Sequence, residues 1–190
     1  TPALGPWRKF LERRKKAVKE VNIGLVGKYD LQDAYKSIRE SLSQAGTYND
    51  YKTVITFINS ENLTEDTVAE KLKGMDGVVI CPGFGQRGIE GKIVAAHYTR
   101  THDIPTFGIC LGMQMMVVEF ARNVLGYADA NSREMDEKTP HNVIDIMEEQ
   151  KTSPTWAAPC VWGPTSAYCG RARACSTSTS RSTYRSATAT

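Results

Sequence analysis

Short apolar segments alternate with segments of helical periodicity, and this alternation is the feature that most constrains the fold. The segments expected to be strands are Val21–Gly27, Thr53–Ile58, Asp76–Ile80, Ile104–Ile109 and Val143–Met147. The segments expected to be helices are Ala34–Gln44, a segment from Thr64 to near Gly74, Gly91–Arg100 and Leu111–Leu125. Strands that are apolar on both faces and alternate with helices predict an α/β fold, an open parallel sheet with helices on both faces.

Cys110 lies at the predicted turn between a strand and the longest helix, within the sequence Gly108-Ile109-Cys110-Leu111-Gly112. A G-x-C-x-G turn in this context is the cysteine form of a nucleophile elbow. The positive end of the following helix favours a thiolate, and its unpaired N–H groups could stabilise an oxyanion. The motif alone leaves open a second interpretation, a buried structural cysteine in a strand-to-helix turn.

The glycine-rich segment from Cys81 to Gly91 follows another predicted strand, so it lies at the same edge of the sheet as Cys110. The backbone N–H of Gly83 could supply a second oxyanion donor there. Alone, the glycines are also compatible with a phosphate cradle or a flexible turn. We expect Cys81 to be a buried thiol at the end of its strand rather than a second nucleophile.

Composition excludes several classes of protein. The formal net charge is +3, with no face that looks built for nucleic acid, and no apolar run is long enough to span a membrane. We expect no signal peptide. The 5 cysteines are irregularly spaced without a CxxC pair, which argues against a zinc site and against a disulfide framework. A reducing, cytoplasmic location is expected.

The two ends of the chain differ from the middle in composition. Trp7–Glu20 has the pattern of a basic amphipathic helix, and we expect residues 1–20 to be a linker helix rather than a surface for phosphate or membrane. After Lys151 there is no Asp, Glu, Lys, His, Asn, Gln, Leu, Ile, Met or Phe. A segment of this kind buries too little apolar surface to fold, so we expect residues 152–190 to be disordered and residues 21–151 to form the domain.

Several motifs together resemble the glutaminase domain of the CTP synthases, which are class I (triad) glutamine amidotransferases. They are Gly27-Lys28-Tyr29, Asp33-Ala34-Tyr35-Lys36-Ser37, Arg87-Gly88, Glu90-Gly91-Lys92, Gly108–Gln114, Glu119–Asn123, and Ala130-Asn131-Ser132 with Glu134. The resemblance runs from about Val21 to Lys151. It implies a flavodoxin-like open parallel sheet from which the C-terminal part of the domain is missing.

The resemblance also implies an activity. A glutaminase domain of this family hydrolyses glutamine through a cysteine thioester, and the ammonia serves the ATP-dependent amination of UTP to CTP in a synthase domain that would precede this sequence. The resemblance implies no cofactor or metal in this domain, and ATP, UTP, GTP and magnesium for the full-length enzyme. The implied partners are L-glutamine, the synthase domain and further copies of the chain, which would associate through that domain.

The resemblance assigns roles to individual residues. Cys110 would be the nucleophile, Gly83 and Leu111 would hold the oxyanion, and Arg87 is a candidate contact for GTP. The residues expected to bind glutamine are Gly83, Phe84, Leu111, Gly112, Met113, Gln114 and Glu134. Without the resemblance, Glu134 would be interpreted as a solvated acid in a loop.

The sequence departs from the family at several points. The family loop reads Pro-Gly-Gly-Phe-Gly, whereas Pro82-Gly83-Phe84-Gly85 is one glycine short, and Arg133 stands where the family usually has threonine. The family segments Leu-Gly-Gly-Thr-Met-Arg-Leu-Gly, Glu-Arg-His-Arg-His-Arg and His-Pro-Glu are absent. None of the histidines present, which are His97, His102 and His141, matches the triad position. We therefore expect this chain to be inactive alone.

The genetic code offers a reason for the unusual C-terminal segment. Back-translated and read from the third base of each codon, Thr155–Gly163 allows Leu/Met-Gly-Gly-Thr-Met-Arg-Leu-Gly, and Arg185–Thr190 allows Glu-Arg-His-Arg-His. Both matches share one frame, which predicts a reading-frame shift after about Lys151, although a genuine Ser/Thr-rich tail remains an alternative. The functional alternatives are a non-catalytic module that binds glutamine or a partner, and a cysteine hydrolase that uses a different base.

Overall fold

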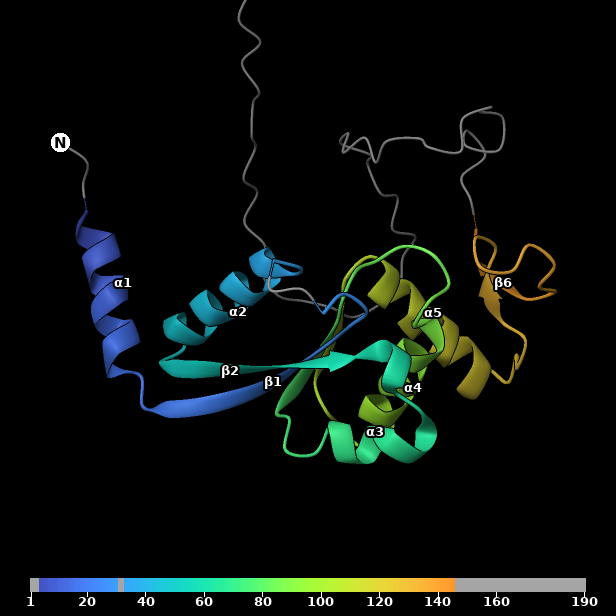
Figure 1. The fold of residues 1–190 in the computed structure, drawn as a ribbon, viewed down its shortest axis with the longest axis horizontal. Coiled ribbons are helices and arrows are strands. Elements are labelled where there is room, and N and C mark those ends of the chain that lie inside the picture. Colours follow the sequence, from blue (N-terminus) through green and yellow to red (C-terminus); the bar gives the residue numbers. More distant parts are fainter. Residues whose placement is uncertain (1–3, 31–32, 146–190) are drawn as a thin grey trace, which may run out of the picture. The chain divides into compact units, whose positions relative to one another are not determined.

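A computed structural model describes residues 4–30 and 33–145, all of which belong to one compact unit, Thr1–Lys151 (Figure 1). Its main sheet has the strand order β2-β1-β3-β4, and every pair of neighbours is parallel. The strands are β1 (Lys19–Gly27), β2 (Tyr51–Asn59), β3 (Gly77–Ile80) and β4 (Thr106–Gly108). This order and direction confirm the predicted open parallel α/β fold.

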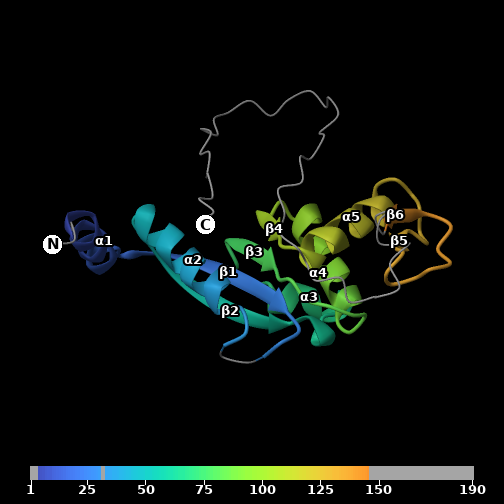
Figure 2. The same cartoon turned by 90° about the horizontal axis from the view of Figure 1, so that it is seen from above.

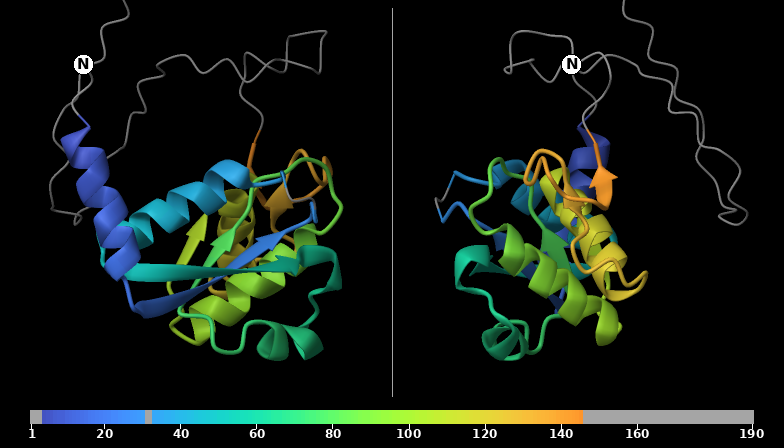
Figure 3. Two further views of the ribbon diagram at one scale, coloured as in Figure 1. Left: turned by 60° about the vertical axis from the view of Figure 1, so that its left-hand side comes forward. Right: turned by 90° about the vertical axis from the view of Figure 1, so that its right-hand side faces the viewer.

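Helices cover both faces of this sheet, as Figure 3 shows. On one face, α2 (Lys36–Tyr48) packs Ile38 and Leu42 against Leu25 and Val79. On the other face lie the short 3₁₀ turn η1 (Ser60–Asn62), α3 (Glu65–Lys71) and α4 (Ile89–Thr101). The core of this second face consists of Val26, Ile58, Leu63, Val68, Leu72, Val78, Ile80, Ala95 and Ala96.

The last described helix, α5 (Leu111–Asn123), packs on α4 and begins directly after β4 and Cys110. A second, two-stranded parallel sheet follows it, formed by β5 (Asn131–Ser132) and β6 (Asn142–Ile144) (Figure 2). We did not predict β5, because two polar residues carry no strand pattern. The buried residues that join this region to the helices are Ile89, Ile93, Leu111, Met115, Val118 and Met135.

The N-terminal helix is shorter than expected: α1 spans Gly5–Lys16, and β1 begins at Lys19. The expected end of the helix at Glu20 and the expected start of the strand at Val21 are therefore wrong. Lys19 and Glu20 lie opposite Tyr51 and Lys52 in the sheet, and Lys52 Nζ forms a 2.8 Å ion pair with Glu20. These cross-strand contacts extend the strand into residues whose own pattern continued the helix.

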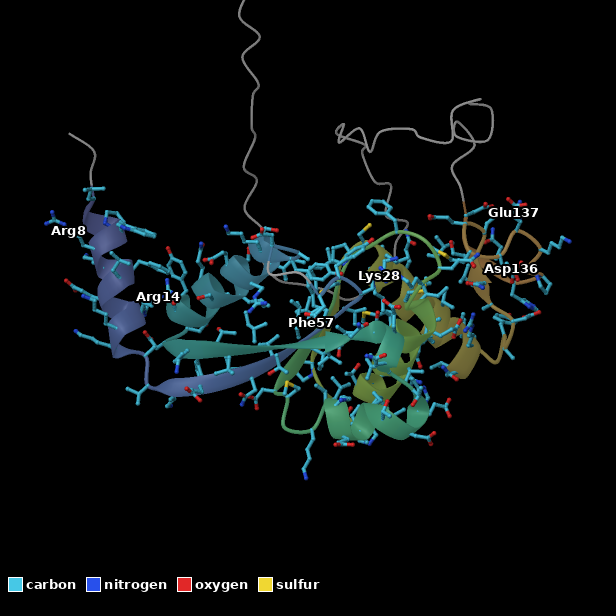
Figure 4. All side chains as sticks on the ribbon, viewed as in Figure 1. Arg8, Arg14, Lys28, Phe57, Asp136 and Glu137 are labelled. Atoms are coloured by element: carbon cyan, nitrogen blue, oxygen red, sulfur yellow. The ribbon has the colours of Figure 1, made fainter. Side chains whose placement is uncertain are left out.

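Helix α1 contacts the end of α2 through an aromatic pair and an ion pair. Phe10 is buried and its ring lies 5.3 Å from that of Tyr48, while Arg13 Nε lies 2.6 Å from Asp50 Oδ1. Arg8 and Arg14, labelled in Figure 4, extend from the same helix and are exposed. The structure thus agrees with a mostly solvated helix that is attached along one side.

Helix α2 begins and ends later than the predicted segment Ala34–Gln44. Asp33 is not its N-cap, because Tyr35 occupies that position with a left-handed φ of 61°. Gly46 lies within the helix, although glycine is the residue type that most often follows a helix end. A Cβ at Gly46 would overlap Thr53 Oγ1, so this glycine allows helix and strand to approach closely instead of stopping the helix.

The remaining predicted bounds differ by a few residues. The glycine segment ends earlier than Gly91, because Gly88, with a φ of 73°, is the N-cap of α4. The part of Val143–Met147 beyond Asp145, the frame shift and the expected disordered tail lie outside the described residues. Within residues 4–30 and 33–145, none of the helices combines the length and hydropathy of a membrane-spanning segment.

Candidate active site

Cys110 occupies a strained backbone position between β4 and α5. Its φ is 52° and its ψ is −113°, a region that residues with a side chain rarely adopt. The thiol is exposed, whereas Cys81 is fully buried. This confirms the prediction that Cys110 is the more accessible thiol of the described residues. Backbone strain at one exposed nucleophile is the geometry expected of an elbow.

The two glycines that flank Cys110 are required by close backbone contacts. A Cβ at Gly108 would lie 2.6 Å from the backbone nitrogen of Met113, and one at Gly112 would overlap the carbonyl oxygen of Ile80. The first turn of α5 therefore packs directly against β4 and β3. The spacing Gly-x-Cys-x-Gly reflects this crowding, which only glycine permits.

Helix α5 presents an unpaired N–H group beside the thiol. The N–H of Gly112 donates to Ile109 O at 2.9 Å and that of Gln114 to Cys110 O at 3.1 Å. Among the described residues, the N–H of Leu111 has no backbone partner. As the first residue of the helix, Leu111 leaves a donor free for an anion, and its role in holding an oxyanion stays a prediction.

Two buried lysines donate hydrogen bonds to backbone carbonyls of the glycine segment. Lys92 is 0% exposed, and its Nζ donates to Cys81 O at 2.6 Å and reaches Pro82 O at 3.5 Å. Lys28 is 4% exposed, and its Nζ donates to Phe84 O and, at 3.3 Å, to Gly85 O. Figure 4 labels Lys28 at the carboxyl end of β1. Sequence reasoning missed both roles, although both lysines lie in the motifs used above.

Tyr35 completes this support. Its hydroxyl accepts a 3.3 Å hydrogen bond from the N–H of Lys28 and donates at 3.4 Å to Pro82 O. A Cβ at Gly27 would lie 2.7 Å from the Tyr35 ring, so Gly27 makes room for it. Burial raises the pKa of Tyr35, which keeps its hydroxyl protonated as a donor.

Burial shifts the pKa values of Cys81 and of the neighbouring Lys92. Burial raises the pKa of Cys81 to about 12, an effect that the nearby Lys92 only partly offsets. Burial likewise lowers the pKa of Lys92 to about 8. At neutral pH, Cys81 is therefore a protonated, inaccessible thiol, as predicted, and not a second nucleophile.

The residues predicted to bind glutamine lie around Cys110 and the glycine segment. Gly83 is buried, and a Cβ on it would lie 3.7 Å from Leu111 Cδ2, so the two predicted oxyanion donors belong to neighbouring segments. Gln114 has a buried Oε1 without a hydrogen-bond partner among the described residues. Met113 and Phe84 are 48% and 71% exposed. A buried acceptor without a partner is typical of a site that a ligand completes.

The segment that carries Glu134 is fixed to the glycine segment. Gln86 Nε2 donates to Met135 O at 2.9 Å, and the buried Met135 packs with Leu111. Glu134 itself is exposed. The structure thereby brings Glu134 into the neighbourhood of residues 83–86 and 111 although it is distant in sequence, which leaves its predicted role open to test.

Two arginines near the site form ion pairs. Arg87 Nη1 lies 2.9 Å from Glu61 Oε1, and Arg133 Nε lies 3.2 Å from Asp145 Oδ1. The Arg87 side chain remains 60% exposed. Its predicted contact with GTP stays a prediction.

The three histidines have other partners. His97 and Arg100 on α4 contact the buried Glu119 on α5, at 2.9 Å and 2.8 Å. His102 stacks on Tyr98, and His141 Nδ1 lies 2.6 Å from Asp129 Oδ1. None of them has a recorded contact with Cys110. No histidine of this chain is therefore placed to be its general base in the described structure.

Comparisons with known proteins agree with this geometry. The family model described as Glutamine amidotransferase class-I matches residues 30–157. Among curated proteins, the chain is 79% identical over 153 residues to a CTP synthase from Bacteroides thetaiotaomicron and 58% identical over 152 residues to one from Flavobacterium johnsoniae. Each alignment covers 80% of this chain and 28% of the relative, so the chain spans little more than a quarter of these relatives' length.

A solved structure is also similar. It is described as the glutaminase domain of Trypanosoma brucei CTPS with bound acivicin, and it matches with a TM-score of 0.64 and 38% sequence identity. The match covers 68% of this chain and 51% of that one. The fold therefore has a counterpart of known structure.

Proposed function

Because the chain belongs to the class I glutamine amidotransferase family, we propose that it is the glutaminase part of a CTP synthase and that Cys110 attacks the side-chain amide of L-glutamine. The observation that carries this proposal is the elbow: an exposed thiol at a φ of 52° between β4 and α5, beside the glycine segment. The similarity to CTP synthases supports the side-chain amide of glutamine as the group that Cys110 attacks.

The proposed chemistry begins with the thiolate of Cys110. Its sulfur bonds to the amide carbon, and the carbonyl oxygen becomes an oxyanion that accepts hydrogen bonds from the N–H groups of Leu111 and Gly83. As this intermediate collapses, its amide nitrogen takes up a proton and leaves as ammonia, and a glutamyl thioester remains on Cys110. Water then attacks the thioester, which releases glutamate and restores the thiol.

The amino-acid end of glutamine would bind on either side of the thiol. The unpaired Oε1 of Gln114 offers an acceptor for an N–H group of the substrate. Glu134 offers a carboxylate for the substrate ammonium, a pairing favoured by opposite charge. Phe84, Gly112 and Met113 would provide the remaining contacts.

Among the described residues, no histidine is placed to give a proton to the leaving nitrogen, since His97, His102 and His141 have other partners. Triad members act as a unit, and losing the base forfeits several orders of magnitude in rate. We therefore expect the chain alone to bind and react with glutamine analogues but to turn over glutamine slowly.

The fate of the ammonia follows from the similarity to complete CTP synthases. A synthase domain would use ATP and magnesium to aminate UTP to CTP, in a cytoplasmic homo-oligomer, with GTP acting near Arg87. Helix α1, which is attached by Phe10 and Arg13, would lead to that domain. These features belong to the whole protein and are proposed on its relatives.

Labelling by acivicin, the compound bound in the trypanosomal relative, tests the proposal. We expect acivicin to modify Cys110, L-glutamine to protect it and D-glutamine not to, with Cys110→Ser unlabelled. Labelling that L-glutamine does not slow would contradict the proposal. Slow ammonia release that Cys110→Ser abolishes is the result expected of the proposal. Labelling with no ammonia release at all would favour the second candidate, a glutamine-binding module without turnover, which the other partners of the histidines suggest.

A further inference from the structure

Four carbonyl groups of the glycine segment accept hydrogen bonds from side chains of low exposure. Lys92 Nζ donates to the carbonyls of Cys81 and Pro82, and Lys28 Nζ donates to those of Phe84 and Gly85. The Tyr35 hydroxyl also donates to the carbonyl of Pro82. A Cβ added at Gly83 would lie 3.0 Å from Lys28 Cε and 3.6 Å from Lys92 Nζ, so both lysine side chains border this residue. Lys92 and Lys28 thus fix the orientation of successive peptide planes rather than binding a ligand of their own.

The orientation of a carbonyl decides the orientation of the next N–H group. In a planar trans peptide, C=O and N–H point in opposite directions. Because the carbonyl of Pro82 is drawn toward Lys92 and Tyr35, the N–H of Gly83 points away from them. Among the described residues this N–H has no backbone partner, so it is free to donate to a bound group.

Packing alone does not explain a lysine at position 92. Burying an ammonium group costs free energy, and an apolar side chain of similar length would fill the same space at lower cost. The position is 0% exposed and borders the backbone of Gly83, where an added Cβ would lie 3.6 Å from Lys92 Nζ. The buried ammonium group of Lys92 must therefore have a role that an apolar side chain could not perform.

We propose that Lys92 is a positioning residue: by holding the carbonyls of Cys81 and Pro82, it aims the N–H of Gly83 at the oxyanion formed on Cys110. Lys28 holds the following two carbonyls in the same way. This inference rests on the proposed glutaminase function and deepens it. It also accounts for an oxyanion donor in a segment that is one glycine short of the family pattern.

The test separates positioning of the donor from reactivity of the thiol. L-Glutamate γ-semialdehyde adds to a cysteine thiol, forming a C–S bond while the aldehyde oxygen takes the thiol proton or stays charged in the oxyanion site. Iodoacetamide alkylates the same thiol without forming an oxyanion. We expect Lys92→Met to bind the aldehyde about 10²-fold more weakly, the loss typical of one oxyanion donor, with its alkylation rate within about threefold of wild type.

Lys73→Met is the matched control, because Lys73 is exposed and its side chain has no hydrogen bond or ion pair among the described residues, and it should change neither quantity. Equal aldehyde affinity in wild type and Lys92→Met would overturn the inference and leave the proposed function intact. Failure of the wild-type chain to bind the aldehyde while Cys110 still alkylates would overturn the proposed function, and the inference with it.

A measurement on the wild-type chain covers the case in which Lys92→Met does not fold. The amide proton of Gly83 should shift downfield in the NMR spectrum when the aldehyde binds, because it gains a charge-assisted hydrogen bond. A Gly83 amide that does not respond to bound aldehyde would overturn the inference without any variant.

Discussion

The α-carbon of Gly112 lies directly against the carbonyl of Ile80, so closely that a Cβ on Gly112 would overlap the oxygen. Gly112 lies in the first turn of α5, and Ile80 is the last residue of β3. Cys110 precedes this turn, and the glycine segment follows β3. One backbone contact therefore sets the distance between the thiol and the predicted oxyanion donor of Gly83.

Gly112→Ala should displace the start of α5. Overpacking of this kind costs typically 1–3 kcal/mol, so we expect a loss of about 2 kcal/mol in the free energy of unfolding and slower alkylation of Cys110. Urea unfolding and iodoacetamide kinetics measure the two effects. The control is Gly5→Ala, a helical glycine whose added Cβ would meet no atom of another described segment within 4 Å, and it should alter neither. An unchanged alkylation rate in Gly112→Ala would contradict this account.

Cys110 should react with iodoacetamide far faster than Cys81 at pH 7.5. Cys81 is 0% exposed and its pKa is raised to about 12 by burial, so its thiolate is on the order of 10³-fold scarcer than that of an ordinary cysteine. Peptide mass spectrometry assigns the label to each site. Comparable rates at the two cysteines in the folded protein would show that Cys81 is not enclosed as described.

Glu119→Gln should destabilise the packing of α4 against α5. Glu119 is 2% exposed, and its carboxylate accepts hydrogen bonds from Arg100 at 2.8–3.1 Å and contacts His97. Burial acts to raise the pKa of Glu119, but these bonds outweigh it and lower the pKa overall. We expect a loss of about 1.5–3 kcal/mol in the free energy of unfolding, because a neutral amide at this buried position bonds less strongly to the charged Arg100 than the carboxylate does.

Glu90→Gln provides the matched comparison. Glu90 pairs with Arg122 at 3.2 Å but its side chain is 67% exposed, so we expect a change within about 0.5 kcal/mol. Since the folded pKa of Glu119 is depressed, its stabilising effect should be present above the unfolded pKa and be lost as the pH falls through the folded value. An equal loss in the free energy of unfolding in Glu119→Gln and Glu90→Gln would contradict this prediction.

The free energy of unfolding should rise between about pH 7.5 and pH 9. The folded pKa of Lys92 is about 8, and that of an unfolded lysine is about 10.4, so in this range the unfolded chain binds more protons. We expect a gain on the order of 1 kcal/mol in wild type and none in Lys92→Met. Urea unfolding at several pH values measures it.

Above about pH 9 this rise should level off. Cys81 keeps its proton to about pH 12 when folded but loses it near pH 9 when unfolded, which gives the opposite slope. A continued rise to pH 10.5, or the same slope in Lys92→Met, would show that another group controls the dependence.

The fold could be predicted from the sequence because strands and helices alternate and each strand is apolar. The ends of the helices and strands could not be predicted where a contact between residues distant in sequence overrides the local pattern. Gly46 looks like a helix stop but lies inside α2 against Thr53, and Lys19 continues a helical pattern but pairs with Tyr51. In each case a neighbour that the local sequence does not reveal decides the outcome.

The elbow was likewise predictable, since Cys110 and its two glycines are adjacent in sequence. The side chains that donate hydrogen bonds to the glycine segment could not be predicted. Lys28, Tyr35 and Lys92 come from separate parts of the chain, and a lysine in an amphipathic pattern normally indicates solvent. Only the folded backbone shows that these side chains turn inward and donate to carbonyls.

The backbone contacts at the elbow have a consequence for tolerated variation. Gly112 meets the carbonyl of Ile80, Gly108 meets the backbone of Met113, and a Cβ at Gly91 would overlap the carbonyl of Ser60. Every amino acid supplies the atoms on the far side of these contacts. These contacts therefore place no requirement on the side chains at positions 60, 80 and 113, whereas the three glycines opposite them should admit almost no replacement in a saturation library.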